Sequence, residues 1–204
     1  EVPVSEIRYR DAAVGGCVEA AIERRSDGCT LLRSTEALRW FPQRLTDCLE
    51  QWAEAAPERT FAARRDHEGA WVRIGYAQML ERARSVGQAL VDLGLSTERP
   101  LAILSENDLE HLTLALGAMW AGVPYVPIST AYSLVSQDYG KLRHILATTT
   151  PGLVFASSEA YARAIDATVS ADAAVVLTAG AIAGRPTRSF ASLLQTAPGP
   201  TLAA

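Results

Sequence analysis

Apolar residues recur every three or four positions along much of the chain, which is the spacing of an amphipathic helix. The longest such stripe runs from Tyr76 to Leu93 and is followed by Gly94, a residue type that favours helix ends. Gly75 stands where an N-cap is expected, and Gln78 takes the position that completes a capping box. The same spacing predicts further helices over 45–56, 109–121, 137–149 and 159–169.

Short apolar runs alternate with these helices in the second half of the chain, over 101–104, 124–128, 153–156 and 173–177. Strands that are separated by helices form βαβ units, so we expect an α/β fold with a mainly parallel sheet and helices on both faces. Pro124 and Pro127 carry no amide hydrogen, which places the strand over 124–128 at the edge of that sheet.

Two β-hairpins are expected before the parallel sheet. Turn residues at 26–28 separate the apolar stretches 18–25 and 29–33, and turn residues at 66–69 separate 61–65 from 71–74. The predicted organisation is a hairpin extension over 1–44, an α/β subdomain over 45–189 and a tail or linker over 190–204. An alternative for the last segment is that it folds back as a lid, because Phe190, Leu193 and Leu194 have helical spacing.

The composition supports a globular protein and excludes several classes of partner. Hydrophobic residues make up 49% of the 204 residues, and the net charge of −4 argues against a nucleic-acid partner. No apolar run approaches the roughly 18 residues of a membrane helix, so no membrane is expected as a partner. The cysteines at 17, 29 and 48 form no metal-binding or redox pair, and no signal segment follows Glu1. We expect a protein of a reducing, cytoplasmic compartment.

The search for chemistry yields no catalytic residue and no metal site. The glycine patterns of dinucleotide and P-loop sites and of serine hydrolases are missing, and Gly180 with Gly184 lacks a following helix. No metal-ligating residue lies three or four positions after His111 or His144. The carboxylates at 106, 108 and 110 are interpreted as charges that favour a helix start, and the arginines at 59, 64, 65 and 73 as a solvated face.

Three segments of the sequence resemble the motifs of a known enzyme family. The stretches GYAQML at 75–80, RPLAILSEN at 99–107 and AMWAGVPYVPIS at 118–129 resemble, in order and spacing, the first core motifs of the adenylate-forming enzymes. That superfamily contains acyl- and aryl-CoA synthetases, luciferases and the adenylation domains of peptide synthetases. The string at 131–146 and the LLRS end of the first hairpin are more similar to the feruloyl-CoA synthetase branch.

The resemblance implies a Rossmann-like N-terminal subdomain of an acid–CoA ligase, which uses ATP, Mg²⁺ and coenzyme A. Such an enzyme converts a small carboxylic acid, in this branch an aromatic hydroxycinnamic acid, to an acyl-AMP and then to a thioester. The phosphate-binding loop, the hinge and the catalytic lysine of the C-terminal domain have no counterpart here. We therefore expect an N-terminal fragment that is inactive by itself and holds none of the cofactors.

The resemblance also implies one candidate contact and one surface. In some relatives the loop after the second motif lines the coenzyme A channel, which corresponds to Ser129 and Thr130; the alternative is an ordinary N-cap or turn. The family's N-terminal subdomain packs on a second subdomain, so self-association of this chain is expected. A different function class, a non-catalytic binding or interaction module on the same scaffold, remains open.

Overall fold

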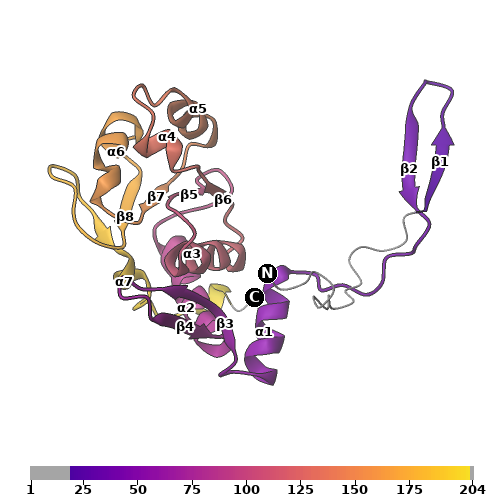
Figure 1. The fold of residues 1–204 in the computed structure, drawn as a ribbon, viewed down its shortest axis with the longest axis horizontal. Coiled ribbons are helices and arrows are strands. Elements are labelled where there is room, and N and C mark those ends of the chain that lie inside the picture. The colour runs from indigo at the N-terminus through magenta and orange to yellow at the C-terminus, as the bar shows by residue number, and fades with distance from the viewer. Residues whose placement is uncertain (1–18, 203–204) are drawn as a thin grey trace, which may run out of the picture. The chain divides into compact units, whose positions relative to one another are not determined.

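A computed structural model describes residues 19–202, and the chain divides into two compact units, residues 1–42 and residues 43–204 (Figure 1). The first unit contains one hairpin, and the second contains the other hairpin and the α/β layers. Cys17 and the first predicted position of the first hairpin lie outside the described residues.

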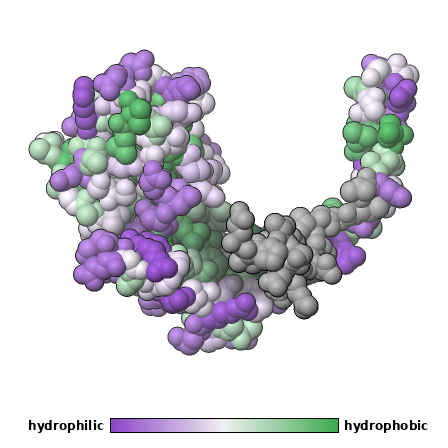
Figure 2. Space-filling model, viewed as in Figure 1, coloured by the Kyte–Doolittle hydropathy of each residue, from purple (hydrophilic) through white to green (hydrophobic). Residues whose placement is uncertain are grey.

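The hairpin of the first unit consists of β1 (Ala20–Arg24) and β2 (Thr30–Ser34), paired antiparallel as predicted. Ile22 lies opposite Leu32 in the register, and the two residues remain 64% and 69% exposed. Figure 2 shows apolar residues on this hairpin at the surface. Glu23, on the opposite face, forms ion pairs with arginines of the same hairpin.

The second unit begins with a helix, a hairpin and a long helix: α1 (Leu45–Ala55), β3 (Thr60–Arg65), β4 (Trp71–Gly75) and α2 (Tyr76–Asp92). The predicted hairpin is confirmed, and its β4 strand places Ile74 in a core with Leu49 of α1 and Met79 of α2. This hairpin therefore shares its apolar side chains with the helices around it.

The start of α2 differs from the predicted capping box. Gly75 is the N-cap, but the first amides, those of Tyr76 and Ala77, donate to the backbone carbonyls of Arg59 and Pro57, both at 3.1 Å. A Cβ on Gly75 would lie 2.9 Å from the Pro57 oxygen, so glycine is what permits this approach. Carbonyls of residues 57 and 59 thus satisfy the first two amides of the helix, and the side chain of Gln78 is exposed.

The sheet of the second unit has five parallel strands in the order β6-β5-β7-β8-β9. Their bounds are β5 Leu101–Leu104, β6 Tyr125–Pro127, β7 Leu153–Ala156, β8 Ala174–Leu177 and β9 Arg188–Ser189. The first four are the predicted strands, so the predicted α/β fold with a parallel sheet is confirmed. β6, the strand with the prolines, lies at the edge as expected.

Helices cover both faces of the sheet. The remaining ones are α3 (Leu109–Trp120), α4 (Ala131–Leu134), α5 (Gly140–Thr149), η2 (Glu159–Tyr161), α6 (Ala162–Thr168), α7 (Phe190–Leu193) and η3 (Pro200–Leu202). Alternate residues of β5 point to opposite layers: Leu101 and Ile103 pack with α2 and α3, and Ala102 and Leu104 pack with α5 and α6. Buried cores therefore lie on both sides of the sheet.

The helix predicted over 137–149 begins later, at Gly140. Ser136 and Asp138 form a local turn instead, in which the Asp138 carboxylate accepts from the Gly140 amide at 3.0 Å and the Ser136 hydroxyl accepts from the Tyr139 amide at 3.0 Å. Such side-chain bonds compete with helical ones, so the helix loses its first predicted turn.

The segment predicted as a tail or linker over 190–204 packs on the α/β unit over its described part. Phe190 is buried and its ring meets that of Phe155 edge to face at 6.0 Å between centroids. Farther along, the Gly199 amide donates to the Gln88 side chain at 2.8 Å and the Trp120 indole donates to the Leu202 carbonyl at 3.3 Å. The fold-back alternative describes this segment better than the linker interpretation.

Within residues 19–202, no helix has both the length and the apolar character needed to cross a membrane.

Candidate functional site

The chain reverses direction across the sheet between β5 and β7, which are neighbours. After β5 the chain crosses through α3 to β6 on one side, and after β7 it crosses through α6 to β8 on the other. Connections that leave adjacent strands toward opposite faces open a crevice at the carboxyl ends of those strands, where α/β proteins usually bind ligands. This end of the sheet is therefore the candidate site.

Polar residues follow the strands at this end. The carboxyl-edge cluster, as it is called below, consists of Ser105, Glu106, Asp108, Thr130, Ser157 and Tyr161. Its members come from the loops after β5, β6 and β7, so the topology of the sheet and not nearness in sequence collects them.

The two residues predicted to contact coenzyme A lie at this edge. Thr130 is the N-cap of α4, and its hydroxyl donates to the Glu106 carboxylate at 3.1 Å. Ser129 is exposed, and its carbonyl accepts from the Tyr132 amide at 3.0 Å. Both residues thus form an ordinary turn, and Thr130 also joins the loop after β6 to the loop after β5.

Asp108 fulfils the role predicted for the acidic residues before the helix over 109–121. It is the N-cap of α3, and its carboxylate accepts from the His111 amide at 2.6 Å. Burial raises the pKa of Asp108 above 3.8, against the lowering effect of that hydrogen bond, and the neighbouring Glu110 raises it further. Glu106 acts differently from the prediction, since its carboxylate bonds to Thr130.

Tyr161 brings a phenol into the cluster. Its ring is 2% exposed, and burial raises the pKa of the hydroxyl above 10.0. A hydrogen bond with Ser157 lowers the pKa, whereas the charges of Glu106 and Asp108 raise it. The phenol is therefore neutral at physiological pH and can serve as a hydrogen-bond donor.

Ser133, in α4, adds a buried hydroxyl next to this region. The residue is 5% exposed, and its oxygen has no hydrogen-bond partner among the described residues. An unpaired buried hydroxyl costs about 1–3 kcal/mol, so a group that bonded it would be stabilised there.

A serine–histidine pair also lies at the edge, but it lacks the arrangement of a hydrolase. The Ser105 oxygen is 3.1 Å from Nδ1 of His111, and the same nitrogen is 3.2 Å from the Glu106 carbonyl. Asp108 bonds to the His111 backbone, so it does not orient the ring as the third member of a triad would. The pair supports the start of α3.

The fit to metal and phosphate is poor in the part of the chain that the structure describes. No group of three or more acidic, histidine or cysteine side chains there could hold a metal ion. A Cβ added to Gly180 would lie 2.7 Å from a Glu159 carboxylate oxygen, so a negative charge occupies the space beside this glycine. A phosphate group would be repelled at that position.

The sequence interpretation missed Tyr161, Ser133 and Ser157. Ser157 directly follows an apolar strand, and polar residues in that position are a usable signal for the carboxyl edge of a parallel sheet. Tyr161 and Ser133 carry no such signal, because only the packing of η2 and α4 brings them to the edge.

Comparison with known proteins gives a family. The model of the AMP-binding enzyme family matches residues 49–197. Bacitracin synthase 3 from Bacillus licheniformis is 33% identical over 90 residues, which cover 43% of this chain and 1% of that protein. Luciferin 4-monooxygenase from Nipponoluciola cruciata is 31% identical over 88 residues, which cover 43% of this chain and 15% of that protein.

Solved structures share the fold at low identity. A putative long-chain-fatty-acid CoA ligase from Rhodopseudomonas palustris has a TM-score of 0.61 and 22% identity, covering 76% of this chain and 37% of that one. A fatty acyl-adenylate ligase from Legionella pneumophila, solved with acyl adenylate and pyrophosphate, has a TM-score of 0.56 and 19% identity. The match covers 78% of this chain and 26% of the ligase chain. The chain thus spans well under half of these relatives, and by the family match over 49–197 it belongs to the AMP-binding enzyme family.

Proposed function

We propose that this chain is the N-terminal α/β part of an ATP-dependent acid–CoA ligase. The observation that carries the proposal is the family match over residues 49–197. Such a part supplies a scaffold and one wall of a site. The reacting groups come from elsewhere in the enzyme.

The proposed reaction has two group transfers. The carboxylate of the acid displaces pyrophosphate from the α-phosphorus of ATP and gives an acyl-AMP. The thiol of coenzyme A then attacks the acyl carbon and displaces AMP, which gives the thioester. Mg²⁺ would offset the phosphate charge during the first transfer, and its ligands are not expected in this chain.

The contact with coenzyme A is proposed for Ser129 and Thr130. The carboxylate of Glu106, bonded to the Thr130 hydroxyl, repels phosphate groups, so a contact here suits the neutral, amide-bearing arm of coenzyme A better than its phosphates. Ser129 is exposed and can donate a hydrogen bond to such an amide.

The proposed acid is a hydroxycinnamate or a related aromatic carboxylic acid. Its support is the similarity of residues 131–146 and of the LLRS end of the first hairpin to the feruloyl-CoA synthetase branch. We also propose a cytoplasmic location, which the free thiols of Cys29 and Cys48 suit because a reducing compartment preserves them.

Exchange of pyrophosphate into ATP, measured for the complete enzyme, tests the reaction and the substrate separately. Exchange with ferulate supports both. Exchange with dodecanoate but not with ferulate would contradict the proposed substrate. The absence of exchange with any acid would contradict the proposed ligase reaction.

The chain alone provides the control and separates the ligase part from a binding module. We expect no exchange and no heat of ATP–Mg²⁺ binding in isothermal titration calorimetry. Micromolar ATP affinity of the chain alone would contradict its proposed inertness and favour a self-contained binding module.

Substitutions test the coenzyme A wall in the complete enzyme. Ser129→Ala with Thr130→Val is expected to raise KM for coenzyme A several-fold and to leave pyrophosphate exchange unchanged, because exchange precedes thioester formation. Thr148→Val, at an exposed position near the end of α5, is the matched control and should change neither quantity. An unchanged KM in the double variant would remove these residues from the site.

A further inference from the structure

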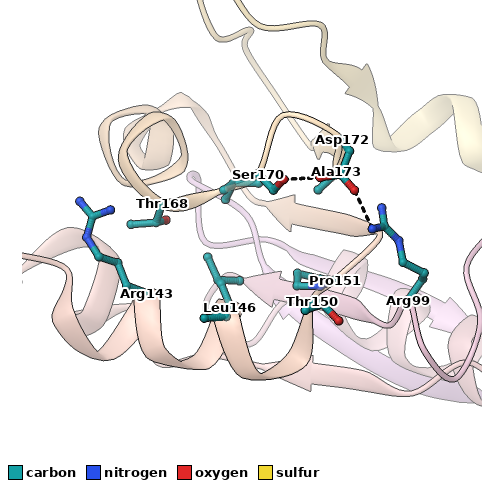
Figure 3. Close-up of a pocket in the computed structure, with 11 residues that line it drawn as sticks. Arg99, Arg143, Leu146, Thr150, Pro151, Thr168, Ser170, Asp172 and Ala173 are labelled. Atoms are coloured by element: carbon teal, nitrogen blue, oxygen red, sulfur yellow. Dashed lines mark hydrogen bonds and ion pairs between the residues drawn. The ribbon is translucent and has the colours of Figure 1, made fainter.

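A cavity of about 400 Å³ lies at the amino ends of β7 and β8, the end of the sheet opposite to the carboxyl-edge cluster. Its walls are the second half of α5, the end of α6 and the turns before β5, β7 and β8. Figure 3 shows Arg143 and Arg99 at opposite ends of this row of residues, with Leu146 and Pro151 between them. The volume lies within the range of about 300–1,000 Å³ that small-molecule sites occupy.

The floor of the cavity is made of buried apolar side chains. Leu146, Pro151, Val169 and Ala173 line it and are themselves buried. Such a floor accommodates a short hydrocarbon or an aromatic ring, and its side chains need no rearrangement to do so. The body of a ligand would therefore be apolar.

The polar side chains at the rim carry a net positive charge. Arg99 donates to the Asp172 carboxylate at 2.6 Å, and the hydroxyl of Ser170 donates to the same carboxylate. Asp172 is thereby neutralised by its own partners, and these bonds hold its pKa below the usual value, the bond from Ser170 contributing most. The stem of Arg99 also packs beside Gly152, where an added Cβ would lie 3.2 Å from the Arg99 Cβ. Arg99 is thus a fixed wall of the cavity.

Arg143 supplies a second positive charge, and the Asp138 carboxylate near the start of α5 also interacts with it. Its guanidinium spans from α5 to α6 and donates to the Ala167 carbonyl at 2.5 Å. A guanidinium has five N–H donors, so most of them stay available for a ligand. The side chain is exposed to solvent and lines the cavity at the end opposite to Arg99.

The C-terminal ends of α5 and α6 lie near the cavity and would be expected to repel an anion, but their effect is reduced. α5 and α6 both end here, and free carbonyls at helix ends carry partial negative charge. Arg185, however, donates to the carbonyls of Val169, Ser170 and Ala173 beyond the end of α6. The hydroxyls of Thr148 and Thr149 donate to the carbonyls of His144 and Ile145 within α5. The carbonyl of Ala167 near the end of α6 and those of Val169, Ser170 and Ala173 beyond it are therefore already occupied.

We propose that this cavity binds a small monocarboxylate with an apolar body, whose carboxylate pairs with Arg143 and whose body rests on the floor around Leu146 and Val169. The site lies at the opposite end of the sheet from the carboxyl-edge cluster, so it is separate from the proposed ligase chemistry and can fill independently of it. A carboxylate suits the guanidinium fork, which binds two oxygens side by side.

Titration of the 204-residue chain with hexanoate, hexylamine and hexanol, followed by amide chemical shifts, tests the proposal. Hexanoate is expected to give saturable shifts at residues 146–151 and 168–173, and to bind at least about ten-fold more tightly than hexylamine or hexanol. Equal or tighter binding of hexylamine, shifts confined to other parts of the chain, or no saturable shift overturns the proposal.

Variants then assign the charge and the cavity. Arg143→Gln is expected to weaken hexanoate binding at least about ten-fold, because it removes the charge-assisted pairing of the carboxylate with the guanidinium. Ala147→Phe, at an exposed position of the rim, should abolish binding by filling the space. Arg163→Gln removes an exposed arginine of α6 outside the cavity and should leave the affinity unchanged. If Arg143→Gln and Arg163→Gln weaken binding equally, the attraction is a general charge effect and the assigned site is wrong.

Discussion

The two hairpins of this protein have the same local design and different surroundings. Each is a pair of antiparallel strands closed by an Asp-containing turn, with a glycine at φ +87° in the first (Gly28) and φ +85° in the second (Gly69). In the first, Ile22 is 64% exposed, whereas in the second Ile74 is 1% exposed. Hairpins are marginal in isolation, so the second hairpin owes its stability to the helices that cover it.

The difference is one of tertiary partners. Phe61 of β3 meets Tyr76 of α2 edge to face at 5.0 Å between ring centroids, and Arg64 pairs with Glu110 of α3 at 3.7 Å. In the first hairpin, Glu23 pairs with two arginines of the same hairpin, as with Arg33 at 3.4 Å. A turn and an alternating pattern thus specify a hairpin, whereas burial of its apolar face depends on the other elements that pack against it.

Hydrogen exchange should give the largest contrast. Ladder amides of β3 and β4 are expected to exchange about a thousand-fold more slowly than those of β1 and β2, because opening the second hairpin disrupts a shared core and opening the first does not. Mass spectrometry of peptides covering 19–34 and 60–75 measures this. Equal protection would mean that the first hairpin is covered in solution.

Substitution of the matched isoleucines should separate the hairpins next. Ile74→Ala is expected to lower the free energy of unfolding by about 3 kcal/mol, since it opens a cavity in the core around Met79. Ile22→Ala removes an exposed side chain and should change it by under about 0.5 kcal/mol. Urea unfolding monitored by tryptophan fluorescence gives both values, and similar losses would contradict the comparison.

The exposed pair on the first hairpin makes self-association of the chain a further expectation. Ile22 and Leu32 form an apolar face that two copies can cover by packing against each other. Ile22→Glu combined with Leu32→Glu is expected to weaken the association of the chain about ten-fold in analytical ultracentrifugation. A monomer at tens of micromolar concentration, with no dye binding, would contradict the expectation.

The turn glycines offer a subtler test. Neither Gly28 nor Gly69 has an atom within 4 Å of an added Cβ, so alanine strains the backbone alone. Gly69→Ala is expected to lower the free energy of the main unfolding transition by about 1 kcal/mol. Gly28→Ala should leave that transition unchanged, because β1 and β2 lie in the other compact unit. A cost at Gly28 similar to that at Gly69 would show that the units unfold together.

The smallest expected effect comes from the charge of Asp108, the N-cap of α3, which interacts with Arg64 of the second hairpin. The pKa of Asp108, beside Arg64 and Glu110, is raised above 3.8 chiefly by burial. The folded state therefore binds the Asp108 proton more tightly than the unfolded state does. Below pH 3.8 this group does not change the free energy of unfolding, and above pH 3.8 it lowers that free energy increasingly as the pH rises to the folded pKa. Asp108→Asn keeps an N-cap acceptor. As the pH rises, the free energy of unfolding of the variant should exceed that of the parent by up to about 0.5 kcal/mol. A difference that grows toward low pH would contradict this direction.

Much of the fold follows from the sequence because it depends on local patterns. Periodicity located the helix over 109–121 to within a residue, the prolines of the strand over 124–128 placed it at the sheet edge, and Asp108 was recognisable as a helix start. These features depend on the backbone hydrogen bonds and on the side of each element that must be buried, which neighbouring residues encode.

Other features depend on residues that only the topology brings together. The bond between Thr130 and Glu106, the burial of Ser133 and the pairing of Arg99 with Asp172, 73 positions away, have no periodic signature. β9 is two residues long, too short for a pattern to reveal. The sequence by itself therefore determined the main helices and strands, their order and the class of the sheet, whereas the tertiary structure decided which polar groups meet at each edge and which side chains of the second hairpin are buried. The physical reason is that side-chain contacts across a sheet are set by strand order, which local sequence does not encode.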